Sequence, residues 1–269
     1  MSRTLSDEQV TQAAADLLAA EEGRHQIGLL SLRHPGMTLD DAYAIQSAQM
    51  ATKLEQGREI LGWKIGLTSK VMQQALKIDT PDSGVMYDDM LFPSGGTVPA
   101  GRFIQPRVEA EIAFVMKAPL DGDVTREDVL AATDYVAPSL EILDTRIQRA
   151  DPETGKARII VDTVSDNAAN AGVVLGSQKN DPAAFDLRWT GAIVRKNGEV
   201  ELTGLGAAVL DDPVMGIVWL ARRMHQYGQR IEAGQVILSG SFISPIECPP
   251  ATLIEADFGP FGNVSISFE

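Results

Sequence analysis

The sequence of 269 residues has little of the chemistry that marks many enzyme families. Its single cysteine, Cys248, excludes an intrachain disulfide and a cysteine-rich zinc site. The three histidines, His25, His34 and His225, are far apart, and we interpret them as surface or capping residues. The chain also lacks GxxxxGK[ST], HExxH and GxSxG, and it has no GxGxxG after a strand. Nucleotide-binding and hydrolase motifs of these kinds are therefore excluded.

Positive charge and long apolar runs are also scarce. The 37 acidic residues exceed the 23 basic ones, for a formal net charge of −14. Such a surface repels phosphate backbones, so nucleic acid is not expected as a partner. The longest apolar stretch of the C-terminal third, 214–221, is too short to span a bilayer. The N-terminus is polar and lacks the apolar run of a signal peptide. We therefore expect a soluble cytoplasmic protein without a membrane partner.

The pattern of apolar residues predicts an α+β fold with a curled, mixed sheet. Residues 1–57 form a helical N-terminal region with two helix starts, at Ser6–Gln9 and Thr38–Asp41. Residues 58–269 form a β-rich catalytic domain, and one helix follows Asp212 and Pro213. Pro138 indicates an edge or a bend in its strand. The expected strands are 58–66, 107–116, 134–143, 171–176, 187–198, 234–240 and 262–269.

The most informative short pattern is Glu109-Ala110-Glu111 in a strand of period-two alternation. Residues two apart on a strand point to the same side, so the two carboxylates lie about 7 Å apart on one face. Close carboxylates repel each other and lose hydration, and a divalent cation removes that penalty. The alternative is a solvent-exposed strand face that carries two acids without a function.

Glu141 favours the metal interpretation, because it lies within an apolar strand and a buried acid usually has a partner. If its strand neighbours that of Glu109 and Glu111, three glutamates converge. An all-oxygen site selects a hard cation, Mg²⁺ first and Mn²⁺ next. Three protein ligands leave positions open for water or a chelating substrate.

Further candidates lie near the ends of predicted strands. Lys64 stands between two glycines, and partial burial would lower its pKa and allow acid/base chemistry; a surface lysine on an edge strand is the alternative. Asp82 lies in a turn-like cluster, and on local grounds it is a turn-forming residue. The polar loop 165–172 opens a short helical turn. Small residues at 239–242 allow close approach of a ligand, although a tight turn explains them equally well.

Six of these segments together resemble the hydratase/decarboxylase branch of the fumarylacetoacetate hydrolase superfamily. The resemblance covers nearly the whole chain, and the segment DPET (151–154) is typical of the heptenedioate hydratases within the branch. The segments are GWKIGLTSK (62–70), PDSGVMYDDM (81–90), QPRVEAEIAFV (105–115), APSLEILDTR (137–146), VDTVSDNAANAG (161–172) and AGQVILSGSF (233–242).

The resemblance implies a β-roll fold, roles for particular residues and an assembly. Glu109, Glu111 and Glu141 match the metal ligands for Mg²⁺ or Mn²⁺, and Lys64 and Asp82 match acid/base or substrate-orienting positions. The stretch Ser239, Gly240 and Ser241 matches the place where related enzymes approach the substrate carboxylate. Related hydratases are homo-oligomers, often decamers built from pentamers.

The implied activity belongs to aromatic catabolism. Water adds to 2-oxohept-4-ene-1,7-dioate, through its 2-hydroxydienoate tautomer, and gives 4-hydroxy-2-oxoheptanedioate. An arginine should pair with the distal carboxylate of this small dicarboxylate, and Arg107, Arg146 and Arg149 are the candidates.

Three alternatives remain open. A 4-oxalocrotonate decarboxylase would use the same metal site, and a 2-hydroxypenta-2,4-dienoate hydratase differs only in the length of its substrate. A non-catalytic protein that associates with a decarboxylase and stabilises it is the third, although the retention of all five acidic and basic site residues argues against a purely structural role.

Overall fold

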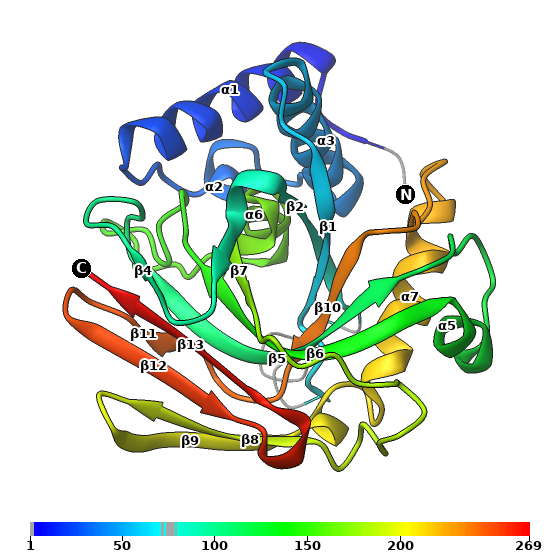
Figure 1. Ribbon diagram of the computed structural model, residues 1–269. Helices are drawn as coiled ribbons and strands as arrows, with labels where there is room; N and C mark the ends of the chain where they lie inside the picture. The colour runs from blue at the N-terminus through cyan, green and yellow to red at the C-terminus, as the bar shows by residue number, and fades with distance from the viewer. Residues whose placement is uncertain (1–2, 71–72, 74–77, 79) are drawn as a thin grey trace.

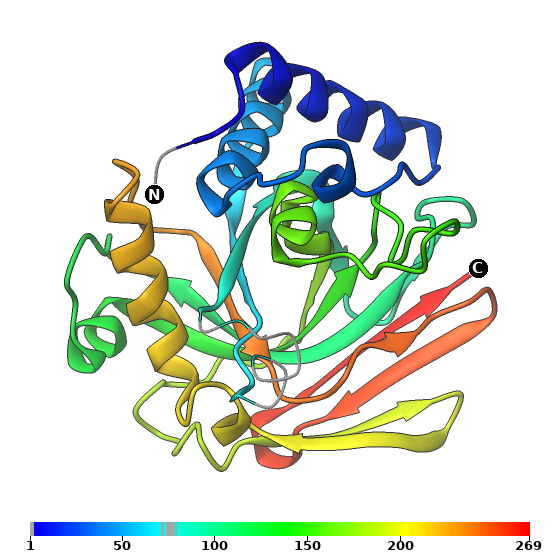
Figure 2. The same cartoon turned by 180° about the vertical axis from the view of Figure 1, so that it is seen from behind.

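The computed structural model describes residues 3–70, 73, 78 and 80–269, so residues 1–2 of the expected helical region lie outside it. Its strands form two sheets (Figures 1 and 2). The larger sheet has the order β2-β1-β10-β5-β6-β7-β3, with β11 paired to β5, and it is mixed, as the sequence predicted. Its strands are β1 Ile60–Gly66, β2 Asp82–Tyr87, β3 Leu91–Pro93, β5 Arg107–Met116, β6 Thr133–Leu143, β7 Asn170–Leu175, β10 Val236–Ser241 and β11 Ile246–Glu247.

The second sheet has the order β4-β13-β12-β8-β9 and packs against the first through β13, which contacts β6 and β7. Apolar side chains from both sheets, with those of α7, form the main core. Its strands are β4 Gly96–Val98, β8 Gly191–Lys196, β9 Glu199–Leu205, β12 Thr252–Asp257 and β13 Asn263–Phe268.

Three helices, α1, α3 and α7, begin where the sequence predicted, whereas α2, α5 and α6 were not predicted. The hydroxyl of Ser6 accepts a hydrogen bond from Gln9 N, Thr38 accepts one from Asp41 N, and Asp212 caps the helix that opens with Pro213. No helix of the described residues is long and apolar enough to cross a membrane. The helices are α1 Asp7–Gly23, α2 Leu30–Arg33, α3 Leu39–Glu55, α5 Arg126–Ala132, α6 Ile160–Ser165 and α7 Pro213–His225, with 3₁₀ turns η1 Asp88–Met90, η2 Asn167–Ala169, η3 Gly206–Ala208 and η4 Gly259–Phe261.

The N-terminal helices gather at one end of the molecule, blue in Figure 1. They bury an apolar cluster of their own, which also takes in Ile147, Val161 and Val164 from much later in the chain. Since α3 packs on α6, the helical region is anchored beside the loop that follows α6. The division at residue 57 stays a prediction.

Pro138 was expected to mark an edge or a bend in its strand, and the edge is wrong. The strand β6 pairs with β5 on one side and with β7 on the other. The pairing with β7 ends at Ser139↔Leu175, where Ser139 is the residue that follows the proline in sequence, and Pro138 O accepts a hydrogen bond from Gly176 N. The missing N–H therefore falls just beyond the ladder, where it removes no strand hydrogen bond.

Candidate metal and substrate site

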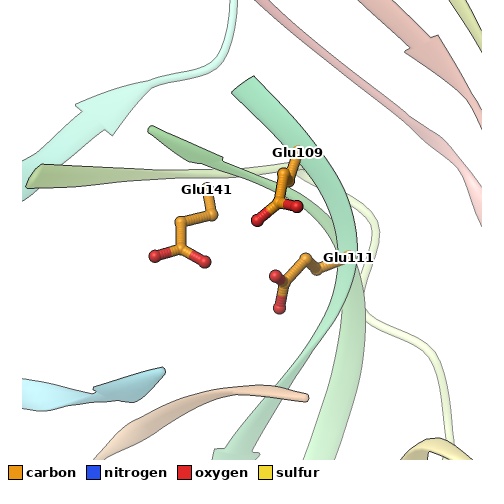
Figure 3. Close-up of side chains that lie close together, drawn as sticks. All are labelled: Glu109, Glu111 and Glu141. Carbon is orange, nitrogen blue, oxygen red and sulfur yellow. The ribbon is translucent and has the colours of Figure 1, made fainter. Parts of the chain in front are cut away.

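Glu109 and Glu141 are register partners on the antiparallel strands β5 and β6. Glu111 lies two residues along β5 from Glu109, on the same face of the strand. One carboxylate oxygen from each of the three glutamates lies within 4.8 Å of the others, and Figure 3 shows the three side chains converging. Glu111 and Glu141 are buried and Glu109 is half-buried, so the interpretation as a solvent-exposed acidic face is wrong.

The electrostatics of these glutamates favour a bound cation. Burial, reinforced by the charge of Glu141, raises the pKa of Glu109 to about 8. The same causes, with the charge of Glu109 added, raise the pKa of Glu111 well above its ordinary value. Full ionisation of carboxylates held this close in a buried site is strongly disfavoured. A divalent cation bound between them would stabilise their ionised form. The donor set therefore fits a hard cation such as Mg²⁺ or Mn²⁺.

Two groups hold Glu141 in place, the side-chain amide of Asn170 and the ammonium group of Lys64. Asn170 Nδ2 donates a hydrogen bond to its Oε1 over 2.8 Å, and Lys64 Nζ lies 3.3 Å from the same oxygen. The other oxygen, Oε2, is buried without a hydrogen-bond partner among the described residues. A free, desolvated carboxylate oxygen that faces two further glutamates is consistent with a metal ligand.

Lys64 reaches Glu141 because the sheet is strongly curled. Their strands, β1 and β6, are separated by β10 and β5, which in a flat sheet corresponds to about 14 Å between strand axes. Lys64 is also buried and β1 is an interior strand, so the alternative of a surface lysine on an edge strand is wrong.

The expected direction of the Lys64 pKa was also wrong. Burial alone would lower it, as the sequence suggested, but the nearby carboxylates of Glu141 and Asp82 outweigh burial and raise the pKa of Lys64. Lys64 therefore stays protonated in this site. Asp82 shows the opposite balance, because burial raises its pKa more than the Lys64 ammonium lowers it.

Asp82 is not the turn residue that its local sequence indicated, since it is the buried first residue of β2, paired with Gly66 on β1. A Cβ atom on Gly66 would lie 2.3 Å from Asp82 Oδ1 and 3.0 Å from Lys64 Nζ. Only glycine leaves room for these two side chains to converge above the backbone. Asp82 Oδ1 has no hydrogen-bond partner among the described residues, so it is available to a ligand.

The three small residues at the end of β10 have different surroundings. Ser239 Oγ is buried and has no hydrogen-bond partner within the described chain. Gly240 N donates a hydrogen bond to Glu111 Oε2 over 2.8 Å, which fixes that carboxylate. Ser241 Oγ donates to Ile243 O over 2.8 Å and closes the turn after the strand. Of the three, Ser239 is the one whose side-chain hydroxyl is free for a substrate.

The loop between α6 and β7 contributes a residue to the site that the sequence did not single out. Asn167, Ala168 and Ala169 all have positive φ, near 50–60°, which is unusual for three consecutive residues other than glycine. This left-handed turn directs Asn167 Oδ1 to Val85 N on β2, and Asn170 follows it at the start of β7 to contact Glu141. The segment DNAANAG was noted in the sequence as a polar loop that opens a short helical turn and as part of the family resemblance, but no residue of it was assigned to the site.

Arg146 holds this turn in place. Its Nε lies 2.5 Å from Asp166 Oδ1, and its other nitrogens donate to the backbone oxygens of Asp166 and Asn170. The arginine and its aspartate are both buried. This ion pair stabilises the backbone that carries Asn170, so the guanidinium of Arg146 is fully used inside the fold.

Comparison with known proteins agrees with this site. The chain is 46% identical to 2-oxo-hept-4-ene-1,7-dioate hydratase of Escherichia coli over 259 residues, which are 96% of this chain and 97% of the relative. It is 40% identical to 2-keto-4-pentenoate hydratase of Paraburkholderia xenovorans over 98% of this chain and 97% of that protein. A scan of protein-family models found no match.

Solved structures show the same architecture. The 4-oxalocrotonate decarboxylase of Pseudomonas putida G7, in a complex with magnesium and adipate, superimposes with a TM-score of 0.94 at 35% identity, and the match covers all of both chains. A fumarylacetoacetate hydrolase family protein from Yersinia pestis matches 77% of this chain and 92% of its own with a TM-score of 0.57 at 13% identity, which shows a shared fold. The chain belongs to the hydratase/decarboxylase branch of the fumarylacetoacetate hydrolase superfamily.

Proposed function

We propose that this protein is a metal-dependent hydratase that adds water to 2-oxohept-4-ene-1,7-dioate through its 2-hydroxydienoate tautomer. The product is 4-hydroxy-2-oxoheptanedioate, an intermediate of aromatic catabolism. The observation that carries the proposal is the glutamate triad beside a buried Lys64–Asp82 pair, in a chain 46% identical to a hydratase of this substrate.

We assign Mg²⁺, with Mn²⁺ as a substitute, to Glu109, Glu111 and Glu141. The supporting observation is the unpartnered Oε2 of Glu141 within a group of three converging carboxylates. When bound, the ion supplies a Lewis acid for a chelating substrate that offers a carboxylate and an adjacent oxygen at C2.

The chain's own residues move the protons. Lys64, kept cationic by its acidic neighbours, stabilises negative charge on the substrate and donates a hydrogen bond. Asp82 has a raised pKa and a free oxygen, which suit an acid/base that takes a proton from water and returns it to carbon. The free hydroxyl of Ser239 donates to the substrate carboxylate. Gly240 and Ser241 line the same turn.

The test is the mass of the product. The purified protein is incubated with 2-hydroxyhepta-2,4-dienedioate and Mg²⁺, with EDTA in a parallel reaction. Gain of one water, abolished by EDTA and restored by excess Mg²⁺, is the expected result. No turnover together with no bound metal would refute both the activity and the metal assignment.

The main alternative is decarboxylation, which is favoured by the close superposition on the magnesium-containing decarboxylase structure. The same mass measurement with a second substrate separates hydration from decarboxylation. A decarboxylase would release CO₂ from 2-oxohex-3-enedioate (4-oxalocrotonate). A five-carbon 2-hydroxydienoate tests the short-substrate hydratase in parallel. Under the scaffold alternative, Glu109→Gln leaves the rate of an associated decarboxylase unchanged; we expect instead loss of metal and of hydration.

We also propose that the protein acts as a homo-oligomer, a pentamer or a decamer. Light scattering on the protein as it leaves a size-exclusion column measures the mass of the assembly directly. A monomer at micromolar concentration would contradict this proposal without affecting the activity.

A further inference from the structure

The three arginines that the sequence offered for a distal carboxylate all have acidic partners. Arg146 is paired with Asp166 inside the fold. Arg107 Nε lies 2.6 Å, and Arg149 Nη1 2.9 Å, from the same oxygen, Oε1 of Glu247. Each of these side chains therefore already bonds a carboxylate of the protein itself. Arg149 keeps one unpartnered nitrogen, the buried Nε, but its two terminal nitrogens bond Glu247 and the backbone oxygen of Gln105, so its terminal fork is occupied.

Arg158 is different, because its side chain has no hydrogen bond or ion pair among the residues that the structure describes. The side chain is half-buried, and its Nη1 is enclosed and unpartnered. A buried guanidinium nitrogen without an acceptor carries the full cost of lost hydration, so such groups normally have a partner. The missing acceptor in the folded protein is the observation that points to a ligand.

The backbone around Arg158 is well fixed. Arg158 N donates to Arg149 O over 2.9 Å, and Ala150 and Ala157 form an antiparallel bridge one residue earlier. The intervening segment 151–156 closes on itself through Asp151, whose backbone and side chain both accept hydrogen bonds. The backbone position of Arg158 is therefore fixed by a hairpin between β6 and α6.

The hairpin of Arg158 is tied to the strand that carries Glu109. Arg158 N donates to Arg149 O, Arg149 and Arg107 both contact Glu247, and Arg107 lies two residues before Glu109 on β5. In agreement with this placement, the charge of Arg158 lowers the pKa of Asp82 and of Asp166. Arg107, on the same face of β5 as Glu109, repels Arg158, as does Arg149. Arg107 and Arg149 share the single carboxylate of Glu247, whereas Arg158 bonds no carboxylate among the described residues. Two guanidinium groups on one carboxylate leave net positive charge at this margin of the site, within a protein of net charge −14.

We propose that Arg158 binds the distal carboxylate of the substrate and so selects dicarboxylates over monocarboxylates of the same length. The inference rests on the proposed function, and it names the substrate class: a 2-oxo acid with a second carboxylate at the far end of its chain. A guanidinium presents paired N–H donors that match a carboxylate, and such charge-assisted bonds are among the strongest in proteins. Arg107 and Arg149 contribute charge, while Arg158 supplies the unoccupied donor.

The test compares two unreactive probes, 2-oxoheptanedioate and 2-oxoheptanoate, which differ only in the distal carboxylate. Their affinities for the Mg²⁺-loaded protein are measured by calorimetry for the wild type, Arg158→Gln and Lys156→Gln. Lys156 is exposed in the same hairpin, so its variant removes an equal charge without touching the site. We expect Arg158→Gln to weaken binding of the diacid by about 10- to 100-fold and that of the monoacid by less than threefold.

The outcomes separate this inference from the proposed function. If Arg158→Gln weakens both probes equally, or neither, or no more than Lys156→Gln does, the assignment of the distal carboxylate to Arg158 is overturned. It is also overturned if the wild type binds neither probe. Hydration of 2-hydroxyhepta-2,4-dienedioate by the wild type is measured separately. A protein that discriminates the probes through Arg158 but adds no water supports the inference and refutes the hydratase.

Discussion

Glu109 and Glu141 stand directly opposite each other on β5 and β6, in a sheet whose curl also brings Lys64 against Glu141. This pairing places two carboxylates where a strand pair normally avoids like charges, because directly opposed like charges destabilise a sheet. The fold tolerates the arrangement through Lys64 and Asn170, and the cation proposed above would complete it. The glutamate triad is therefore expected to be a point of low stability in the metal-free protein, and this has consequences that can be measured.

The first prediction is that Glu109→Gln stabilises the metal-free protein at alkaline pH. The pKa of Glu109 is about 8 in the folded state against an ordinary 4.5, so the folded state holds the extra proton between these values. Its contribution to stability is therefore fully present below about pH 4.5 and is lost as the pH rises to 8. Urea unfolding in EDTA at pH 5 and pH 8.5 measures the difference. We expect the variant to gain stability relative to the wild type between pH 5 and pH 8.5, by about 3–4 kcal/mol. The same change in the free energy of unfolding for both proteins between these two pH values would contradict this.

The second prediction is that Mg²⁺ binding releases protons at pH 7. Glu109 and Glu111 have raised pKa values without metal, because burial and their shared charges disfavour ionisation, and a bound cation must displace the protons. Calorimetry in two buffers of different ionisation enthalpy gives the number released. We expect release between pH 6 and 7.5 and an affinity that rises with pH. A binding enthalpy that is the same in both buffers would show that the glutamates are already ionised.

The third prediction concerns Asn170, which donates to Glu141 from β7. Asn170→Ala removes the donor that orients this ligand, and we expect about 10- to 100-fold weaker metal binding. Asn180→Ala is a matched control, because Asn180 makes a similar amide bond to Phe261 O away from the site. If both variants bind Mg²⁺ as the wild type does, the Asn170–Glu141 contact has no role in the metal site.

Much of the site could be predicted from the sequence, because its strongest signals are local. The alternation around Glu109 and Glu111 fixed the bounds of β5 and the shared face of the two acids. The helix starts at Ser6 and Thr38 were equally secure, since a capping box needs only four residues. Such features depend on neighbours in the chain, and no tertiary contact overrides them.

The features that were missed depend on contacts between distant segments. Asp82 has the sequence surroundings of a turn, yet pairing with β1 makes it the start of a buried strand. The pKa of Lys64 was expected to fall because burial can be inferred from sequence, whereas the acidic neighbours that raise it come from β2, β5 and β6. The left-handed turn at 167–169 contains no glycine, so the sequence gives no local sign of it. Contacts of Arg146 and Asp166 stabilise the turn instead, and these depend on the fold.

The fourth prediction is that Gly240→Ala damages both stability and metal binding. Gly240 has φ of +116°, and a Cβ there would lie 2.4 Å from the Oγ1 of buried Thr68. Gly259→Ala is the control for backbone strain alone, since Gly259 has φ of +60° and open space around its Cβ. We expect the free energy of unfolding to fall by about 1 kcal/mol in Gly259→Ala and by about 3 kcal/mol or more in Gly240→Ala, measured by urea unfolding.

Metal binding separates the site effect from the stability effect in this pair. Because Gly240 N orients Glu111, Gly240→Ala should also weaken Mg²⁺ binding about 10-fold, and Gly259→Ala should not. Adding Thr68→Ala to Gly240→Ala removes the two nearest contacts, with Oγ1 at 2.4 Å and Cγ2 at 2.6 Å, and leaves only the Cβ of residue 68 at 2.9 Å, so it should recover part of the affinity. An affinity that follows stability alone across the three variants would contradict a positioning role for Gly240.

The fifth prediction concerns Asp41, which ties the N-terminal segment to α3. Its carboxylate accepts bonds from the backbone N–H groups of Thr4, Leu5 and Thr38 and from the hydroxyls of Thr4 and Thr38. Although burial opposes ionisation, these bonds hold the pKa of Asp41 well below its usual 3.8. The stability that it contributes is therefore present above about pH 4 and is lost as the pH falls toward the folded-state pKa.

Asp41→Asn tests this acid sensitivity at the N-terminal helices. We expect it to lower the free energy of unfolding at pH 7 by about 2–3 kcal/mol and to flatten the loss of stability between pH 4 and pH 2.5. Asp128→Asn is the matched control, because Asp128 makes the same capping box with Thr125 alone, and it should lower the free energy of unfolding clearly less than Asp41→Asn does. Equal effects of the two variants would show that the bonds to Thr4 and Leu5 add nothing, since the capping box would then account for all of the stability that Asp41 provides.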